Sequence, residues 1–255
     1  MTATLAELRS TLKTARAALI DLDGTLLAGG RLLPGAAEFL QYPPCPFVIV
    51  SNDSEHTPAQ LARKLRGLGV VVPPDRFILA GIVAIESLAQ RAPGEATMVL
   101  GSPAMRHAAR VAGIHVTDTA PRRILLMRDR SFTYARLAAA AAAIFDGAAV
   151  TLACPDLSHP GRRGEPVPEA GALAAALQAC AGPFELEIIG KPEPALFAAA
   201  ARRLGVEPGD CVMVGDNPDT DGLGAARFGM PFYLVSRSAP GDRDPARMQV
   251  VGGDA

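Results

Sequence analysis

The chain has 255 residues, of which 49% are hydrophobic, 20% charged and 5% aromatic, and its formal net charge at pH 7 is −1. A chain of this length forms one large domain or two modest ones, and its apolar content is sufficient for a buried core, which excludes global disorder. The near-balance of charge excludes a general affinity for nucleic acid or for an anionic membrane.

Three features of the sequence bear on the compartment. The cysteines are scattered and form no C-x-x-C pair, which is typical of reduced, buried thiols. The N-terminal segment carries charges from Glu7 to Arg16 and lacks the apolar region of a signal peptide. The longest apolar run, 137–145, is well short of the roughly 20 residues of a membrane span. We therefore expect a soluble, cytoplasmic protein.

Short apolar segments rich in β-branched residues alternate with helical patterns, which is typical of βαβ units and a parallel sheet. The predicted buried strands are 17–21, 47–51, 211–215 and 232–235. Ligands of such sheets bind outside the carboxyl ends of the strands. We therefore expect Asp21, Ser51 and Asp216, which end or follow three of these strands, to share one pocket.

Helices are predicted after these strands at 34–41, 57–68 and 194–204, where proline occupies first-turn positions. A second alternation runs from about residue 81 to 183, with predicted helices at 82–90, 103–112, 134–145 and 170–181 and predicted strands at 97–100, 124–127 and 150–154. This stretch is long enough for a small α/β domain of its own.

The expected organisation is an α/β protein with a discontinuous core. Residues 1–80 and 184–255 form a Rossmann-like parallel-sheet core, and residues 81–183 form a smaller inserted domain. A loose C-terminal tail is expected after Arg237, where proline and glycine recur.

The densest chemical signal is the segment Asp21-Leu22-Asp23-Gly24-Thr25 at the end of the first predicted strand. Side chains at i and i+2 of a strand share a face, so two carboxylates there repel each other unless a cation or a shared proton compensates them. Asp-Gly is also a common turn dipeptide, which is the alternative interpretation of this segment.

A second acidic segment supports the interpretation as a cation site. Gly215-Asp216 ends another apolar strand, and Asp221 follows at a position that starts a helix or orients a water or a lysine. Oxygen-rich sites of this kind suit Mg²⁺, which binds few carboxylates together with water and a substrate phosphate.

Two further segments provide groups that bind a phosphate. Lys191 lies between a glycine and a proline after the apolar residues 188–189, and a fixed ammonium balances carboxylates and phosphate. Ser51 and Asn52 offer a hydroxyl and backbone N–H groups near a helix N-terminus. The alternative role for Ser51 is that of a plain helix cap.

In this order along the chain, the four segments resemble the motifs of the haloacid dehalogenase (HAD) superfamily. The inserted region resembles the cap of the NagD-like subfamily, class IIA, through features that include Gly101-Ser102, Asp129, Pro155-Asp156 and 170–173. The resemblance covers nearly the whole chain before the tail. It implies a HAD core with an inserted α/β cap, and a homodimer formed through the cap.

The resemblance also implies a Mg²⁺-dependent phosphomonoesterase that forms a covalent aspartyl-phosphate. By similarity, Asp21 is the nucleophile and Asp23 the general acid and base. Asp21, the main-chain carbonyl of Asp23, and Asp216 would hold Mg²⁺, with Asp221 behind them. Ser51, Asn52 and Lys191 would bind the phosphoryl oxygens, and Lys191 would also act in catalysis.

Some positions depart from the family pattern and bear on the substrate. Asp53 stands where a second asparagine is usual, and Cys154 stands where the cap usually has asparagine. His159 resembles a cap position that faces the leaving group, and Asp156 is a further candidate for substrate specificity, although an exposed loop histidine is the alternative for His159. These departures leave the individual phosphate ester undetermined.

Three functions are compatible with the sequence. The first is hydrolysis of a small soluble phosphate ester. The second is a phosphotransferase or mutase reaction, in which an alcohol takes the phosphoryl group instead of water. The third is a non-catalytic signalling module that is phosphorylated on aspartate, although such modules place their acidic pair before the phosphorylated residue.

Overall fold

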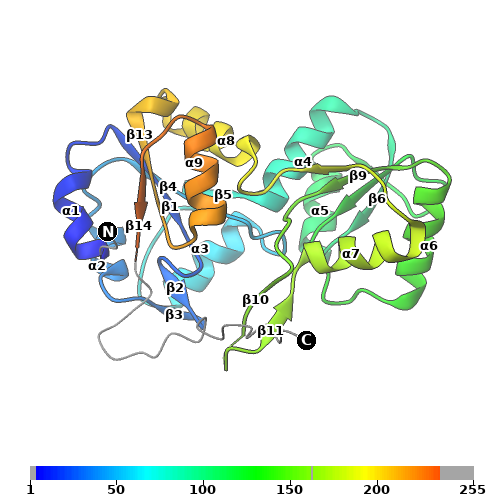
Figure 1. Cartoon of the computed structure of the whole chain (residues 1–255), viewed down its shortest axis with the longest axis horizontal. Coiled ribbons are helices and arrows are strands. Elements are labelled where there is room, and N and C mark those ends of the chain that lie inside the picture. Colours follow the sequence, from blue (N-terminus) through cyan, green and yellow to red (C-terminus); the bar gives the residue numbers. More distant parts are fainter. Residues whose placement is uncertain (1–3, 162, 236–255) are drawn as a thin grey trace, which may run out of the picture.

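A computed structural model describes residues 4–161 and 163–235 of the chain. Two α/β lobes lie side by side, each built around its own five-stranded parallel sheet (Figure 1). We call the lobe that contains both ends of the described chain the core, and the lobe formed by the middle of the chain the cap. The predicted fold class, a parallel-sheet core with an inserted α/β cap, is confirmed. The loose tail expected after Arg237 lies outside the described residues.

The core sheet has the strand order β14-β13-β1-β4-β5, and all neighbouring strands are parallel. Its strands are β1 (Ala17–Asp21), β4 (Phe47–Ser51), β5 (Phe77–Leu79), β13 (Cys211–Gly215) and β14 (Phe232–Leu234). The chain proceeds outward from β1 to β4 and β5, and then from β13 to β14 on the other side of β1. The order therefore reverses between β1 and β13, which is the place where open α/β sheets bind ligands.

Helices cover both faces of the core sheet. One face carries α1 (Leu5–Leu12), α2 (Ala36–Gln41) and α3 (Pro58–Gly67), and the other carries α8 (Pro194–Leu204) and α9 (Leu223–Arg227). Successive residues of β1 point to opposite faces: Ile20 packs with the first group and Leu19 with the second. A strand buried on both sides is apolar throughout, which explains why the core strands were recognisable as continuous apolar runs.

The cap sheet has the order β12-β9-β8-β6-β7, again all parallel. Its strands are β6 (Ala96–Leu100), β7 (His115–Val116), β8 (Arg123–Leu126), β9 (Ala149–Leu152) and β12 (Leu186–Ile188). On one face the sheet packs against α6 (Tyr134–Phe145) and α7 (Ala170–Ala181), and on the other against α4 (Ala80–Arg91) and α5 (Pro103–Val111).

The C-terminal boundary predicted for the cap, residue 183, needs correction. Strand β12 follows that boundary and pairs in parallel with β9, so the cap sheet extends to Ile188. A pattern of three residues is too short to be recognised as a strand, whether they are half-buried as in β12 or buried as in β5.

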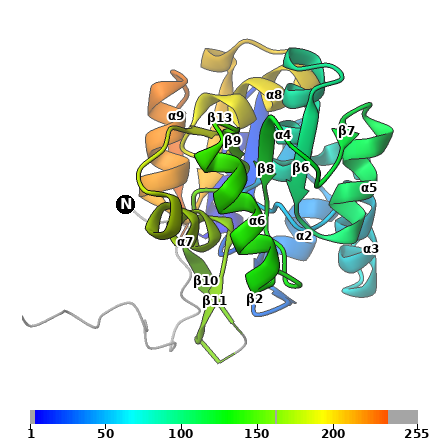
Figure 2. The ribbon, with the colours of Figure 1, turned by 90° about the vertical axis from the view of Figure 1, so that its right-hand side faces the viewer.

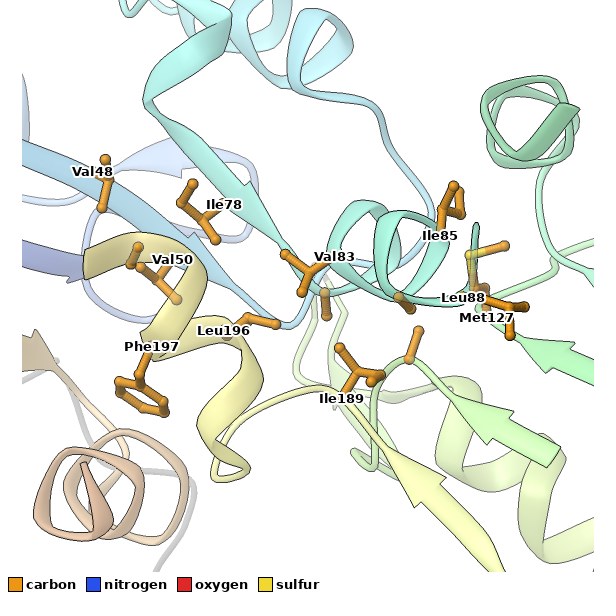
Figure 3. Close-up of a cluster of buried hydrophobic side chains, with 14 of the residues drawn as sticks. Val48, Val50, Ile78, Val83, Ile85, Leu88, Met127, Ile189, Leu196 and Phe197 are labelled. Carbon is orange, nitrogen blue, oxygen red and sulfur yellow. The ribbon is translucent and has the colours of Figure 1, made fainter. Parts of the chain in front are cut away.

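Helix α4 joins the two lobes. Figure 3 shows Val83 of this helix facing the core residues Val50 and Ile78, while Leu88 lies on the cap side near Met127. These side chains belong to one continuous apolar cluster that also includes Ile189 on the returning chain. The core and the cap therefore share a hydrophobic core at their junction.

Two hairpins lie on the same side of the molecule, at the bottom of both views (Figures 1 and 2). The core contributes β2 (Leu27–Ala28) with β3 (Arg31–Leu32), and the cap contributes β10 (Ser158–Pro160) with β11 (Pro166–Pro168). Short helical turns at Pro74–Arg76, Pro208–Asp210 and Pro218–Gly222 precede β5, β13 and α9. Within the described residues, no helix combines the length and hydropathy needed to cross a bilayer.

Candidate active site

The predicted site residues lie where three adjacent strands of the core sheet end. Asp21 is the last residue of β1, Ser51 is the last residue of β4, and Asp216 directly follows β13. Because β13, β1 and β4 are neighbours and parallel, these three residues lie at one edge of the sheet, beside the point where the strand order reverses.

Lys191 lies among these strand ends and is almost completely buried. Its ammonium donates hydrogen bonds to Asp21 Oδ1 at 2.5 Å and to Asp221 Oδ1 at 2.6 Å, and both carboxylates are also buried. A third contact, to the carbonyl oxygen of Val50, measures 3.4 Å. One buried lysine therefore connects the end of β1 to the segment that follows β13.

The charges around Lys191 shift the pKa values of the groups involved. Burial alone would lower the pKa of Lys191, but the adjacent carboxylates of Asp21 and Asp221 outweigh it and raise that pKa, so the ammonium stays charged. Burial, with the negative charge of Asp21, raises the pKa of Asp221 although Lys191 opposes this shift. A single ammonium therefore does not compensate all the carboxylates around it.

A third carboxylate completes an acidic cluster. Oxygens of Asp21, Asp216 and Asp221 lie within 4.8 Å of one another. The chain reaches this arrangement through Gly24, whose φ is +93° and whose missing Cβ would lie 2.2 Å from Asp216 Oδ2. Three hard oxygen donors beside one ammonium leave excess negative charge, and this donor set fits a divalent metal ion.

Asp221 lies in the same acidic cluster as the predicted metal ligands. The sequence places it behind the metal ligands, and in the fold its Oδ1 accepts a hydrogen bond from the Lys191 ammonium, so the prediction that Asp221 orients a lysine agrees with this contact. Thr25, in the predicted motif, donates to the other oxygen of Asp21 at 3.2 Å. Both oxygens of Asp21 are therefore fixed by the core.

Asp23 follows Asp21 by two residues, just after the end of β1. Its side chain is solvent-exposed, unlike that of Asp21, yet surrounding protein desolvates it. This desolvation, followed by the negative charges of Asp21 and Asp53, raises the pKa of Asp23 to about 6. A carboxyl group with a raised pKa is suited to both donating and accepting a proton near neutral pH.

The loop after β4 carries the predicted phosphate-binding residues. Ser51 is buried, and its Oγ accepts a hydrogen bond from the backbone N–H of Asp53 at 3.1 Å. The side chain of Asn52 is bonded to protein groups: its Oδ1 accepts from the backbone N–H of Lys191 at 2.7 Å, and its Nδ2 donates to Asp156 Oδ2 at 3.1 Å. The predicted role of Asn52 in binding a phosphate therefore concerns its backbone N–H.

The structure shows the surroundings of the two departures at Asp53 and Cys154. The Asp53 carboxylate accepts bonds from the backbone N–H groups of Glu55 and His56 and lies 2.7 Å from Nδ1 of His56. The extra negative charge is therefore balanced inside its own loop. Cys154 is buried in the apolar cluster of the cap, and burial raises the pKa of its thiol.

Cap residues reach this loop from the other side. Asp156 contacts Asn52, as described above, whereas His159 in β10 lies 2.7 Å from Glu169 Oε1 without an aligned hydrogen bond. Arg128 pairs with Glu169 at 3.2 Å and with Glu55 of the core loop at 3.1 Å.

Three of these residues were not predicted from the sequence. Glu55, Arg128 and Glu169 are isolated charges in the sequence, typical of solvated surface positions, and no motif distinguishes them. In the fold they lie at the contact between core and cap, where desolvation raises the pKa of Glu169 to about 7 although Arg128 opposes this shift.

Comparison with known proteins agrees with this geometry. Residues 18–115 match the family described as haloacid dehalogenase-like hydrolase, and residues 188–250 match a second family, described as HAD-hydrolase-like. An acid sugar phosphatase of Staphylococcus aureus is 31% identical over 228 residues, which cover 88% of this chain and 87% of that protein.

Solved structures extend the similarity to the cap. NagD from Escherichia coli K-12 superposes with a TM-score of 0.79 at 29% identity, covering 89% of each chain. A glycerol phosphate phosphatase from Mycobacterium tuberculosis, in complex with magnesium, gives a TM-score of 0.80 at 28% identity, covering 94% of this chain and 71% of that chain. The same enzyme has also been solved in complex with calcium.

The sheet, the acidic cluster and the buried lysine together define a hydrolase of the haloacid dehalogenase class. The chain belongs to the haloacid dehalogenase-like hydrolases, in the NagD-like branch whose cap it shares. The resemblance stated from the sequence motifs is thereby confirmed.

Proposed function

We propose that the protein is a Mg²⁺-dependent phosphatase that hydrolyses small phosphomonoesters through an aspartyl-phosphate on Asp21. One observation carries this proposal: the buried ammonium of Lys191 holds Asp21 at 2.5 Å, within a cluster of three carboxylates at the reversal point of the sheet. Phosphoryl transfer depends mainly on positioning and on neutralising spread negative charge, and this arrangement provides for both.

The proposed first step forms the covalent intermediate. A carboxylate oxygen of Asp21 attacks phosphorus, and the bond between phosphorus and the ester oxygen breaks. Asp23 gives its proton to that oxygen, so the product leaves as a neutral alcohol. Lys191 and the hydroxyl of Ser51 stabilise the phosphoryl oxygens.

The second step releases the phosphate. Water attacks phosphorus, Asp23 takes a proton from that water, and the bond between phosphorus and Asp21 breaks. Inorganic phosphate leaves, and both aspartates return to their starting states. Asp23 therefore serves first as acid and then as base, and the pKa raised to about 6 agrees with this double role.

The cation in this proposal is Mg²⁺. Asp21, the main-chain carbonyl of Asp23, and Asp216 would hold it, with Asp221 beside them in the same cluster. When bound, it would neutralise charge on the phosphoryl oxygens and on the clustered carboxylates.

The names of the relatives support a substrate class. Those described above are named an acid sugar phosphatase and a glycerol phosphate phosphatase. We propose that this chain acts on a phosphate ester of the same size, such as a sugar or glycerol phosphate, with His159 of the cap near the leaving group.

The experiment that tests the function is turnover of p-nitrophenyl phosphate, with a panel of sugar and glycerol phosphates, in the presence of Mg²⁺. We expect Asp21→Asn to lower kcat by roughly a thousandfold or more, because it removes the nucleophile. The matched control is Asp219→Asn, an exposed carboxylate near the same cluster, which should retain activity. EDTA should abolish turnover, and added Mg²⁺ should restore it.

Undiminished turnover by Asp21→Asn would contradict the mechanism. Addition of acceptor alcohols to the assay separates hydrolysis from phosphotransfer, because a transferase would convert the added alcohol into a new phosphate ester. Absence of turnover on the whole panel, with Asp21 phosphorylated by a small phosphodonor, would indicate the signalling module instead.

A further inference from the structure

We infer that Asp156 of the cap is a positioning residue for Lys191: it holds Asn52, and Asn52 in turn holds the backbone of Lys191. The inference rests on the proposed function, since it gives Asp156 a role in the phosphate site of that reaction. It replaces the expectation that Asp156 selects the leaving group.

The first argument is the hydrogen-bond chain from cap to core. Asp156 Oδ2 accepts from Asn52 Nδ2 at 3.1 Å, and the same amide nitrogen donates to the carbonyl oxygen of Lys191 at 3.2 Å. Asn52 Oδ1 accepts from the backbone N–H of Lys191 at 2.7 Å. The Asn52 side-chain amide therefore bonds both the backbone N–H and the carbonyl oxygen of Lys191, and Asp156 fixes the orientation of that amide.

The second argument is how closely the segments approach at Gly190. A Cβ on Gly190 would lie 2.7 Å from Asn52 Oδ1 and 2.7 Å from the carbonyl oxygen of Ala153, and 3.1 Å from the ring of Pro155. Only a residue without a side chain lets the β4 loop, the cap loop at 153–156 and the Lys191 segment meet at this point.

The third argument is that the cap holds Asp156 rigidly. The backbone N–H of Gly171, in α7, donates to the carbonyl oxygen of Asp156 at 3.0 Å. A Cβ on Gly171 would lie 2.2 Å from the carbonyl oxygen of Pro155, so the first turn of α7 packs directly on this loop. Asp156 is therefore a fixed point from which Asn52 can be oriented.

Loss of the Asp156 contact should affect binding of the phosphoryl group, which all phosphate esters share, and not binding of the alcohol part, in which they differ. The Lys191 ammonium contacts Asp21 at 2.5 Å and Asp221 at 2.6 Å, distances that tolerate little displacement of its backbone. Releasing Asn52 would shift the ammonium that every phosphate ester meets. A residue that selected the leaving group would affect some esters and not others, and this difference makes the two roles separable.

The test compares Asp156→Ala with the conservative Asp156→Asn, whose amide oxygen still accepts from Asn52. Two readouts are needed: kcat and KM for p-nitrophenyl phosphate and for glycerol 3-phosphate, and the inhibition constant of inorganic phosphate. We expect Asp156→Ala to lower kcat by the same factor on both esters, about tenfold for one lost positioning hydrogen bond, and to weaken phosphate inhibition. Asp156→Asn should remain within about twofold of the parent on all readouts.

The matched cap control is His159→Ala, which should leave phosphate inhibition unchanged. If Asp156→Ala does not fold, Asp156→Ser serves with the same readouts, because its short hydroxyl does not reach Asn52. An unchanged phosphate inhibition constant with a KM effect confined to one ester would overturn the inference. That result differs from a failure of the proposed function, which would appear as a parent enzyme without turnover or an active Asp21→Asn variant.

Discussion

At the scale of single residues, Lys191 decides whether the acidic cluster is stable. It is buried between two buried carboxylates, so its removal leaves Asp21 and Asp221 buried without the ammonium that they share. Removing one partner of a buried ion pair typically lowers the free energy of unfolding by about 3–5 kcal/mol, far more than the loss of an exposed charge does.

We therefore predict that Lys191→Met destabilises the protein by about 3 kcal/mol or more in metal-free buffer, measured by denaturant unfolding. Lys13→Met, which removes an exposed lysine after α1, should change stability by less than about 0.5 kcal/mol. Added Mg²⁺ should recover part of the loss, because a cation that binds only the native state stabilises it. Equal, small losses in the two variants would contradict the charge argument.

The pair formed by Asp53 and His56 is a second residue-scale feature. The hydrogen bond to Asp53 raises the pKa of His56, and so do the negative charges of Asp53 and Glu55. Desolvation and the positive charge of Lys64 lower this pKa, but the first group of effects is larger. A raised histidine pKa means that the protonated form is favoured in the native state. Its contribution to stability is therefore complete below the ordinary histidine pKa of 6.5 and is lost as pH rises through the native value.

We predict that His56→Gln destabilises the protein more at pH 6 than at pH 9, measured by denaturant unfolding at the two pH values. The control is His107→Gln, an exposed histidine in α5, whose effect should be small at both. A cost of His56→Gln that is equal at pH 6 and pH 9 would show that protonation of His56 does not contribute.

At the scale of elements, the turn after β1 determines the shape of the acidic cluster. Gly24 adopts a backbone conformation that residues with a side chain rarely adopt, and it does so directly against the carboxylate of Asp216. Gly30, in the β2–β3 hairpin, has a similar φ of +79° but no atom near its missing Cβ. An alanine at either position would strain the backbone, whereas only an alanine at Gly24 would also collide with a neighbouring side chain. Comparing the two variants therefore separates the two effects.

We predict that Gly24→Ala and Gly30→Ala each lose about 1–2 kcal/mol of stability through backbone strain, and that only Gly24→Ala loses the metal site. The measurement is the rise in melting temperature on adding Mg²⁺. The rise should be retained in Gly30→Ala and absent from Gly24→Ala, because the new Cβ displaces Asp216. A full Mg²⁺ response in Gly24→Ala would contradict this account of the cluster.

At the scale of the whole molecule, α4 makes the core and the cap one packed body. Its side chains contribute to an apolar cluster that runs from Val48 and Val50 of the core sheet to Met127, which directly follows β8 of the cap sheet (Figure 3). The position of the cap over the site is therefore held by buried apolar contacts in addition to the polar contacts at Asn52 and Arg128.

We predict that Leu88→Ala, at a fully buried position of α4, costs about 2–5 kcal/mol and lowers the unfolding temperature of both lobes together. Calorimetry should show one transition, and hydrogen exchange should lose protection in core and cap peptides in parallel. Phe145→Ala, at an exposed position on α6, is the control and should have little effect. Separate transitions for the two lobes would show that the shared cluster does not couple them.

The sequence by itself determined the local parts of this molecule. The bounds of β1, β4 and β13 agree with the prediction residue for residue, and so do those of α6, α7 and α8. These elements are strongly patterned, either as apolar runs that are buried on both faces or as helices with clear ends. The motif residues Asp21, Lys191 and Asp216 were also recognisable, because charges next to apolar strands are unusual.

Only the tertiary structure decided which distant residues meet. The edge strands β5 and β12 owe their existence to pairing with a neighbour, and a three-residue pattern does not reveal a partner. The contact of Asp156 with Asn52, and of Arg128 with Glu55 and Glu169, depends on how the cap packs on the core through α4. Chain order fixes what each residue can do chemically, whereas the packing of the two lobes fixes the partner with which it does so.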